Sequence, residues 1–422
     1  MNDRIVQDLL RATLFGGALT AAAMGAGCTD DEAACDPSGG NVCSIAGTGA
    51  AGYLGDDGPA TGADLYLPMD AAYGPDGLLY IVDWNNHRLR SIDANGDIHT
   101  VAGTGRLGDG PNGNALEHDF NHPTDILFDA QGRIIIAAWH NSKLKRFDPA
   151  AGTVEDICGT GRRAYSGDDG PAPMADLDLP ASLAFHPDGR LFVMDQANQV
   201  IRFIDSADTI HRFAGQCIIG ERQMGEELVQ CEGTNKLTTQ LDENPMACAM
   251  PCTPSFGGDG GPADELRMAQ PFGQQADPAG HLVFDAQGNL YFADTKNNRI
   301  RRIDAESGEV TTYAGTGEAG FAGDGGAATE AQLNNPVDLV FDAAGTLYVT
   351  DTMSSCVRAI DPDGTIRTAV GICGQRGFEG DGGPATEALL DRPYGLAMDR
   401  EGNLLVIDTH NHRLRLVGLA TR

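Results

Sequence analysis

The sequence has little positive charge, few aromatic residues and no long hydrophobic run beyond its first 28 residues. It contains 29 Lys and Arg against 60 Asp and Glu, which gives a formal net charge of −31. Non-specific nucleic-acid binding depends on Lys and Arg that neutralise phosphates, so we expect no nucleic-acid partner. Beyond the N-terminal segment, no apolar stretch is long enough to cross a membrane as a helix.

Familiar catalytic motifs are also missing. The chain has no G-x-S-x-G nucleophile motif and no H-E-x-x-H zinc motif, and its ten histidines show no ligand spacing. The sequence therefore favours a binding protein over an enzyme, and it leaves the question of activity open.

Residues 1–28 have the character of an export signal. Arg4 and Arg11 precede an apolar stretch, rich in Gly and Ala, that ends at Cys28 before an Asp-rich run. The stretch is too short to span a bilayer comfortably. It resembles a bacterial lipoprotein signal, which implies that Cys28 carries a lipid as the only membrane anchor. Ordinary cleavage near the same site is the alternative. We expect an exported protein, anchored in the periplasm or on the cell surface, or else secreted.

Glycine, by contrast, is abundant at 56 residues, and much of it falls in a repeat. The string AGTG or a near-copy occurs six times, at successive spacings of 56, 56, 56, 100 and 57 residues. A Gly-Asp-rich loop of the GDGGPA type follows each copy. The copies begin at Ala46, Ala102, Cys158, Ala214, Ala314 and Gly371.

Each period contains four short apolar runs separated by turns. In the fifth period these include 336–341, 347–351 and 357–361, with Gly-containing turns at 343–345 and 362–364. The fourth run leads into the next AGTG. Four short strands with Gly-containing turns in about 56 residues predict one blade of a β-propeller.

The periods resemble NHL repeats of the GDGGPAT type over roughly residues 44–419. The signature D-x-x-N-x-R is clear at 83–88, 294–299 and 408–413. The resemblance implies an all-β, six-bladed propeller of four-stranded antiparallel blades. Departures from the signature are Ala138 and Lys143 in blade 2, Val200 in blade 3 and Cys356 in blade 5.

The two ends of the repeat region predict how the ring closes. Residues 43–47 form an outer strand with no inner strands before it, whereas the C-terminus supplies three inner strands near 395–399, 404–408 and 414–417. Pairing these ends completes the sixth blade and removes two exposed edges. We therefore expect a propeller over 43–422, preceded by the signal and by a flexible linker at 29–42.

Cysteine spacing predicts disulfides, as is usual for exported chains. Cys356 and Cys373 face each other around one turn of blade 5, and their disulfide is worth about 3 kcal/mol. Cys35 and Cys43 can pair before the ring, and Cys158 is left as a buried thiol. Four more cysteines can form two disulfides in any of three connectivities, or, less favourably, a zinc site. These four are Cys217, Cys231, Cys248 and Cys252.

The 100-residue spacing marks two insertions beside blade 4. The larger is the Cys-rich segment at about 216–257, and the smaller lies between Pro271 and Ala279. Both fall on the rim that carries the longer loops. A lid or partner-specific elbow and a surface decoration without function are both open interpretations.

Antiparallel blades place the Gly-Asp loops and the D-x-x-N-x-R loops on one rim and the tight hairpins on the other. Both tryptophans, Trp84 and Trp139, occupy the same repeat position on blades 1 and 2, near His122, His140 and His410. These residues either pack on their neighbours or line a pocket for a sugar, a peptide or an apolar side chain.

A recurrent aspartate begins each signature loop except in blade 2. Our favoured interpretation is that each carboxylate accepts backbone N–H groups and pairs with an Arg to hold the loop. The alternative is a calcium ion in the central channel, since inward carboxylates suit a hard cation. The residues are Asp83, Asp195, Asp294, Asp351 and Asp408.

These observations favour a monomeric scaffold at the cell envelope that binds a protein, peptide or glycan through the loop-rich rim. The alternative is a metal-assisted hydrolase or lyase, because related lactonase-like and amidating-lyase-like propellers hold a metal in the central channel. That alternative rests on analogy of fold, and fold does not imply function.

Overall fold

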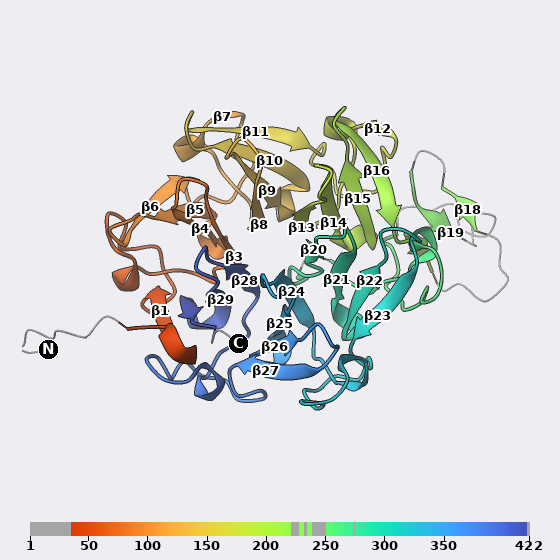
Figure 1. Ribbon diagram of the computed structural model, residues 1–422. Coiled ribbons are helices and arrows are strands. Elements are labelled where there is room, and N and C mark those ends of the chain that lie inside the picture. Colours follow the sequence, from red (N-terminus) through yellow and green to blue (C-terminus); the bar gives the residue numbers. More distant parts are fainter. Residues whose placement is uncertain (1–34, 221–227, 232–233, 239–249, 274, 420–422) are drawn as a thin grey trace, which may run out of the picture. The chain divides into compact units, whose positions relative to one another are not determined.

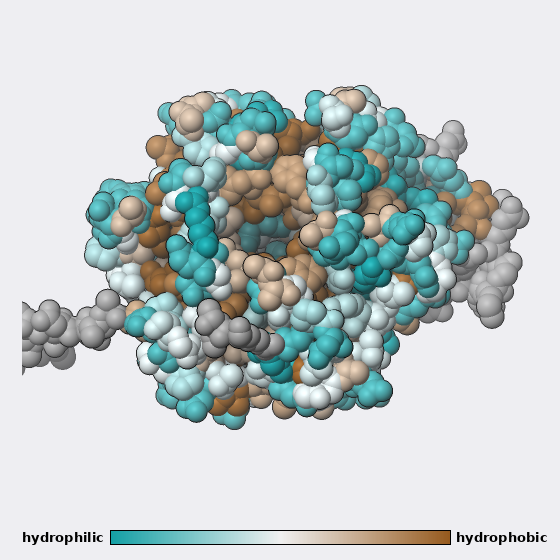
Figure 2. Space-filling model, in the orientation of Figure 1, coloured by the Kyte–Doolittle hydropathy of each residue, from teal (hydrophilic) through white to brown (hydrophobic). Residues whose placement is uncertain are grey.

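The described part of the chain forms six antiparallel sheets arranged around a common centre and one further small sheet at the outer edge (Figure 1). The computed structural model describes residues 35–220, 228–231, 234–238, 250–273 and 275–419. One edge strand of each of the six sheets lies nearest the centre, which is hollowed on the face shown in Figure 2. The all-β six-bladed propeller is thus confirmed. Within the described residues, no helix is long and apolar enough to cross a membrane.

The blades follow the periods of the sequence. Blade 1 comprises β3 (Asp70–Tyr73), β4 (Leu79–Asp83), β5 (Arg88–Ile92) and β6 (Asp97–Ala102). Blade 2 comprises β8 (Pro123–Phe128), β9 (Ile134–Ala138), β10 (Lys143–Asp148) and β11 (Thr153–Cys158). Blade 3 comprises β13 (Pro180–Phe185), β14 (Leu191–Asp195), β15 (Val200–Ile204) and β16 (Thr209–Ala214). The short edge strands β2 (Gly58–Pro59), β7 (Gly113–Asn114) and β12 (Gly170–Pro171) extend these three blades.

The second half repeats the four-stranded pattern. Blade 4 comprises β20 (Leu282–Phe284), β21 (Leu290–Asp294), β22 (Arg299–Ile303) and β23 (Val310–Ala314). Blade 5 comprises β24 (Pro336–Phe341), β25 (Leu347–Asp351), β26 (Cys356–Ile360) and β27 (Ile366–Val370). Blade 6 comprises β28 (Gly395–Met398), β29 (Leu404–Asp408), β30 (Arg413–Val417) and β1 (Val42–Ala46).

Short 3₁₀ turns lie in the connections between strands. One follows the second strand of every blade: η3 (Trp84–Asn86), η5 (Trp139–Asn141), η7 (Gln196–Asn198), η10 (Thr295–Asn297), η12 (Thr352–Ser354) and η14 (Thr409–Asn411). Another follows each Gly-Asp loop: η2 (Ala60–Gly62), η4 (Ala115–Glu117), η6 (Ala172–Met174), η9 (Ala263–Glu265), η11 (Ala328–Glu330) and η13 (Ala385–Glu387). A further turn, η1 (Ser38–Gly40), precedes the ring.

The ring closes as the sequence predicts. β1 pairs antiparallel with β30, with Val42 opposite Val417 and Ala46 opposite Leu414. Because β1 begins beside the end of β30, the chain enters the ring on the hairpin rim. The hydrophobic core is divided into six main clusters, each mainly between two neighbouring blades. The cluster of blades 1 and 2 also includes Val337 of blade 5 and Tyr394 of blade 6. One of these contains residues of blade 1 and blade 6, so closure also buries apolar surface.

The structure contains the disulfides Cys35–Cys43, Cys217–Cys252 and Cys356–Cys373. Cys231 is also disulfide-bonded, and Cys158 is a buried free thiol. Cys217, Cys231 and Cys252 are therefore cross-linked and are not zinc ligands. Cys28 and Cys248 lie outside the described residues. Cys373 is three residues beyond β27 rather than within its end, because β27 stops at Val370.

The disulfides explain two departures from the repeat signature. In blades 1, 4 and 6 the signature Arg stacks on an aromatic ring of the preceding Gly-Asp loop. In blade 3, where Val200 replaces Arg, the Cys217–Cys252 disulfide packs with Val200 and Tyr165. In blade 5, Cys356 itself forms the disulfide. In blades 3 and 5 a disulfide therefore occupies the place of the signature Arg, although in blade 3 Tyr165 still stacks on the buried Arg202 at 5.2 Å.

The Cys-rich insertion adds a small sheet at the outer edge of the ring (Figure 1). Its strands are β17 (Ile218–Ile219), β18 (Val229–Gln230) and β19 (Leu237–Thr238). The N–H of Asn235 donates to the carbonyl oxygen of Tyr165, so the insertion lies against the loop that precedes blade 3.

Candidate ligand-binding site at the mouth of the central channel

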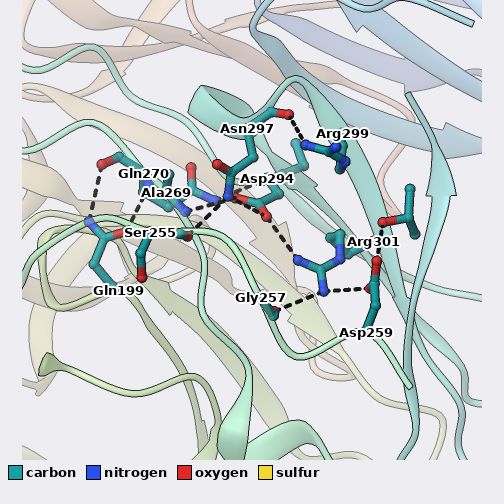
Figure 3. A network of polar contacts seen from close by, with 12 residues as sticks. Gln199, Ser255, Gly257, Asp259, Ala269, Gln270, Asp294, Asn297, Arg299 and Arg301 are labelled. Atoms are coloured by element: carbon teal, nitrogen blue, oxygen red, sulfur yellow. Dashed lines mark hydrogen bonds and ion pairs between the residues drawn. The ribbon is translucent and has the colours of Figure 1, made fainter. Parts of the chain in front are cut away.

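The recurrent aspartates fix the loops of the rim, as blade 4 illustrates (Figure 3). Asp294 accepts hydrogen bonds from the backbone N–H of Ala269 at 2.8 Å and from the side chain of Asn297 at 2.9 Å. Arg301, whose side chain is fully buried, pairs with Asp294 at 3.1 Å and with Asp259 of the Gly-Asp loop at 2.6 Å. One buried guanidinium thus connects the two loops of the blade.

The same arrangement recurs in four other blades, with Arg90, Arg202, Arg358 and Arg415 as the buried cations. In blades 1, 4 and 6 the buried arginine lies two residues after the signature Arg. The signature Arg itself stacks on the aromatic ring of the preceding Gly-Asp loop. Blade 2 lacks the aspartate because Ala138 replaces it. There Lys145 binds Asp109 at 2.7 Å and Asp156 at 2.6 Å.

These contacts argue against the calcium interpretation for the five loop aspartates. Each carboxylate pairs with an arginine of its own blade, so the five do not converge on one ion. Among the described residues, no group of three or more His, Cys, Asp or Glu side chains could hold a metal ion.

A ring of mostly polar residues surrounds the channel, at positions that the repeat signature does not single out. Its members occupy one repeat position in the innermost segment of each blade, and we call this ring the collar. Four of them accept a backbone N–H from the next blade, at 2.5–3.1 Å. The collar consists of Asp70, Asp125, Ser182, His281, Asp338 and Gly395.

Two collar positions, His281 and Gly395, accept no backbone N–H from the next blade among the contacts of the described residues. In each case the aspartate that follows around the ring accepts the N–H of its own neighbour instead. After His281, Asp338 accepts the N–H of its own neighbour Leu339 at 2.6 Å. After Gly395, Asp70 accepts the N–H of Ala71 at 2.7 Å. Gly395 is required by space, because a Cβ there would approach the carbonyl oxygen of Met69 to 2.4 Å.

The collar holds a buried charge pair. His281 Nδ1 lies 2.8 Å from Asp338 Oδ1, and both side chains are almost fully buried. Burial alone would lower the pKa of His281, but the carboxylates of Asp338, Asp125 and Asp70 raise it to about 10. Burial raises the pKa of Asp70 well above its usual value, and the neighbouring Asp125 adds to this. His281 is therefore the cation of the collar.

Next to the collar, on the side of the loop-rich rim, four of the six blades place a buried apolar residue. The residues that directly precede collar positions include Met69, Ala181, Val337 and Tyr394, all buried. Trp84 packs against the clusters that contain them. Figure 2 shows hydrophobic side chains on the wall of the central hollow. We call these four residues together with Trp84 the mouth.

The predicted aromatic residues of blades 1 and 2 form one cluster at the mouth. The ring of Trp84 lies 4.5 Å from that of His122, and Trp139 stacks on His140 at 4.2 Å. His122 and His140 are in edge contact at 4.9 Å. His410 belongs to blade 6, where its ring lies 6.2 Å from that of Tyr394.

The two tryptophans have different surroundings, although they share a repeat position. Trp139 is 1% exposed and its indole N–H donates to Gln196 Oε1 at 3.3 Å, so it is not available as an exposed anchor. Trp84 is only partly buried. Its Nε1 is enclosed and has no hydrogen-bond partner among the described residues. Trp84 therefore lies at the mouth with part of its side chain exposed, while its N–H is an enclosed donor without a partner among the described residues.

The smaller insertion, 271–279, reaches the same cluster. The side chain of Gln196 donates to the carbonyl oxygens of Pro271 and Asp277 and accepts the N–H of Ala279. Ala276 packs against the cluster that contains Trp139 and Trp84. This insertion is thus anchored on blade 3 and adjoins the mouth.

Burial keeps the histidines of the rim neutral. It lowers the pKa of His122 to about 3, with a further contribution from His87. It lowers the pKa of His140 to about 4, together with Arg163, and that of His410 to about 4, together with Arg392. At neutral pH the cluster is therefore an uncharged surface of indole and imidazole rings.

These pKa values predict how the cluster responds to acid. The unfolded chain takes up protons at these histidines near pH 6.5 and the folded chain does so only near pH 3–4, so stability should fall as pH drops through this window. Both tryptophans adjoin these imidazoles. Their emission should stay constant from about pH 7 to 5 and change at lower pH, as recorded in a fluorescence titration. A transition near pH 6.5 in the folded protein would contradict the buried, neutral cluster.

Taken together, the rim loops, the collar and the mouth define a six-bladed β-propeller with a candidate binding site on its axis. Two family models match the C-terminal repeats: a teneurin NHL domain over residues 316–378 and an NHL repeat over residues 390–415. The C-terminal part of the chain therefore contains NHL repeats.

Relatives in sequence are distant and much longer. The chain is 26% identical over 326 residues to Protein SUPPRESSOR OF QUENCHING 1 of Arabidopsis thaliana, covering 76% of this chain and 27% of that protein. It is 26% identical to NHL repeat-containing protein 2 of Homo sapiens, covering 67% and 37%, respectively. For Drosophila melanogaster Teneurin-m the identity is 25%, with 86% and 12% covered. The chain thus spans well under half of each relative.

Solved structures share the fold. An auxiliary nutrient binding protein from Bacteroides thetaiotaomicron superposes with a TM-score of 0.57 at 16% identity, covering 89% of this chain and 76% of that one. A second protein from the same organism gives 0.58 at 16% identity, with 89% and 75% covered. At this identity the likeness concerns the fold alone.

Proposed function

We propose that this protein is an exported binding protein whose ligand occupies the mouth of the propeller. The observation that carries the proposal is Trp84, a partly buried indole at the mouth whose N–H is enclosed and has no partner among the described residues. A buried donor without a partner costs free energy, and a ligand oxygen that gained access to this N–H would recover that free energy. Apolar walls with a few polar groups are typical of small-molecule sites.

Binding is a better account of the polar residues than catalysis. The loop aspartates pair with buried arginines, and most collar oxygens accept backbone N–H groups of the next blade. These groups hold the ring together. A solved protein of the same fold is named as an auxiliary nutrient binding protein, and we propose a role of this kind here.

The proposed location is the cell envelope, with a lipid on Cys28 as the anchor. Disulfides persist in oxidising compartments outside the cytosol, and the chain contains several. Residues 35–41 enter the ring on the hairpin rim, as the start of β1 shows. An anchor attached through them would leave the loop-rich rim free for ligand.

Intrinsic fluorescence tests the proposal directly, because both tryptophans of the chain belong to the cluster at the mouth. A panel of neutral and acidic oligosaccharides and N-acetylated dipeptides is titrated while emission is recorded, and each hit is repeated by calorimetry. A binding compound should shift the emission. Trp84→Ala should weaken its affinity about tenfold or more, since aromatic anchors dominate such sites.

Phe378→Ala is the matched control. Phe378 is 59% exposed in a Gly-Asp loop and stacks on Arg413, so this variant removes a large aromatic side chain away from the mouth. It should leave affinity unchanged. If Trp84→Ala binds the hits as tightly as the native protein, the mouth is not the site.

A further inference from the structure

Two guanidinium groups converge on one carboxylate at the blade 6 side of the rim. Arg392 Nε donates to Asp391 Oδ1 at 3.1 Å. Arg376 Nε lies 3.7 Å from the same oxygen. The side chains of Arg376 and Arg392 are 52% and 29% exposed. This local excess of positive charge stands out in a chain with a net charge of −31.

The outer nitrogens of both arginines are uncommitted. Within the part of the chain that the structure describes, neither the Arg376 nor the Arg392 side chain has another hydrogen bond or ion pair to an acid. A guanidinium presents its N–H groups as a planar fork that matches the two oxygens of a carboxylate. Asp391 can neutralise only one of the two cations, so the pair retains capacity for a second anion.

The backbone holds this pair beside the mouth. Arg392 adopts a left-handed conformation, with φ of 45°, and its backbone N–H donates to Ser355 Oγ at 3.2 Å. Tyr394, two residues later, is a residue of the mouth. The N–H of His410, whose ring neighbours Tyr394, donates to the carbonyl oxygen of Asp391. The backbone of Arg392 is therefore held in place before any ligand binds, which reduces the entropic cost of binding.

One acidic side chain opposes them. Asp277 of the smaller insertion is exposed. Its charge raises the pKa of the Tyr394 hydroxyl, whereas the charge of Arg392 lowers that pKa. Among the described residues, Asp277 has no ion pair with an Arg or Lys. The other nearby carboxylate, Asp408, is fully buried and is held by Arg415. The charge of the site thus depends on the balance between Asp277 and the arginine pair.

We propose that Arg376 and Arg392 form an anion subsite of the mouth, which selects a small ligand that bears a carboxylate. The inference rests on the proposed function, because it names the class of ligand for the same site. The apolar wall and Trp84 take the body of the ligand, and the arginine pair takes its acid group.

Two matched probe pairs test this subsite by calorimetry. The first is trigalacturonate with its trimethyl ester, and the second is N-acetyl-diphenylalanine with its C-terminal amide. Each pair differs mainly in carboxylate charge, and comparing the pairs distinguishes an acidic sugar from a peptide-like acid. At least one acid should bind about tenfold more tightly than its neutral partner, as expected for a charge-assisted hydrogen bond.

Opposite substitutions should shift this preference in opposite directions. Arg376→Gln should reduce affinity for the acid about tenfold and leave the neutral probe unaffected. Asp277→Asn should strengthen acid binding. Arg106→Gln is the control, because Arg106 is 75% exposed on the same rim and pairs with Asp119 instead.

The outcomes separate the two proposals. If acid and neutral probes bind equally and both lose affinity in Trp84→Ala, the mouth binds ligand but the anion subsite is wrong. If Asp277→Asn weakens binding of the acid, the subsite is also wrong. If no acid of either pair binds while a neutral hit of the wider panel does, the preference for a carboxylate fails. If nothing in the wider panel binds, the proposed function fails with it.

Discussion

Replacing Arg301 by methionine is expected to lower the free energy of unfolding by about 3–5 kcal/mol. The change leaves the fully buried carboxylate of Asp294 without its cation and breaks the link to Asp259 (Figure 3). Chemical denaturation monitored by circular dichroism measures the loss. Arg299→Met, on the same strand, removes only a cation–π contact and hydrogen bonds at a more exposed position, so it should cost far less.

Blade 2 supplies the design of a rescue variant. The chain itself replaces the buried Asp–Arg pair there by Ala138 and Lys145, and Asp156 faces Lys145 across the two strands. The triple variant Asp294→Ala, Arg301→Lys, Thr312→Asp recreates this set in blade 4, where Thr312 lies opposite position 301. It should recover most of the stability that Arg301→Met loses. If Arg301→Met is as stable as the native protein, the buried network does not hold the rim.

Replacing Asp338 by alanine should have an effect of similar size, about 3–5 kcal/mol. The change strands the buried imidazolium of His281 and removes the acceptor for the N–H groups of Leu339 and Leu396. The double variant His281→Gln, Asp338→Asn replaces the ion pair with neutral groups, and it should be more stable than Asp338→Ala. Urea denaturation at about pH 7 compares the stability of the native protein with that of the two variants.

The pH dependence of stability identifies the same pair. The folded pKa of His281 is raised to about 10 from an unfolded value near 6.5. Its stabilisation is therefore fully present below about pH 6.5 and is lost as pH rises towards the folded pKa. The native protein should lose stability between about pH 7 and 10, and Asp338→Ala should show a shallower slope. Parallel slopes for both proteins would exclude a charged His281 in the collar.

The architecture follows from the repeat because each period reproduces the same four apolar runs. Closure through β1 followed from counting strands at the two ends, since an outer strand without inner partners must pair with the blade that lacks one. The prediction that the loop aspartates pair with Arg is confirmed. The sequence does not predict which Arg is the partner, because the signature Arg88 and the buried Arg90 are two residues apart on one strand. Only packing shows which of them is enclosed.

The collar could not be recognised from residue identity, because the six blades place Asp, Ser, His and Gly at one position. A signal was nevertheless present. Asp125 and Asp338 are charged residues in otherwise apolar inner strands, which is costly unless a partner is provided. In the same way, the shared repeat position of Trp84 and Trp139 does not predict that their surroundings differ. Gln196, on the next blade, binds the indole of Trp139, whereas the indole N–H of Trp84 lacks such a partner among the described residues.

A single-tryptophan titration tests the central claim most directly. Trp139→Phe leaves Trp84 as the only indole, so its emission reports the mouth alone. Compounds that bind this variant by calorimetry should shift that emission and protect Trp84 from quenching by acrylamide. A compound that binds stoichiometrically without changing the emission or the quenching of Trp84 would place the ligand elsewhere on the propeller, and would contradict binding at the mouth.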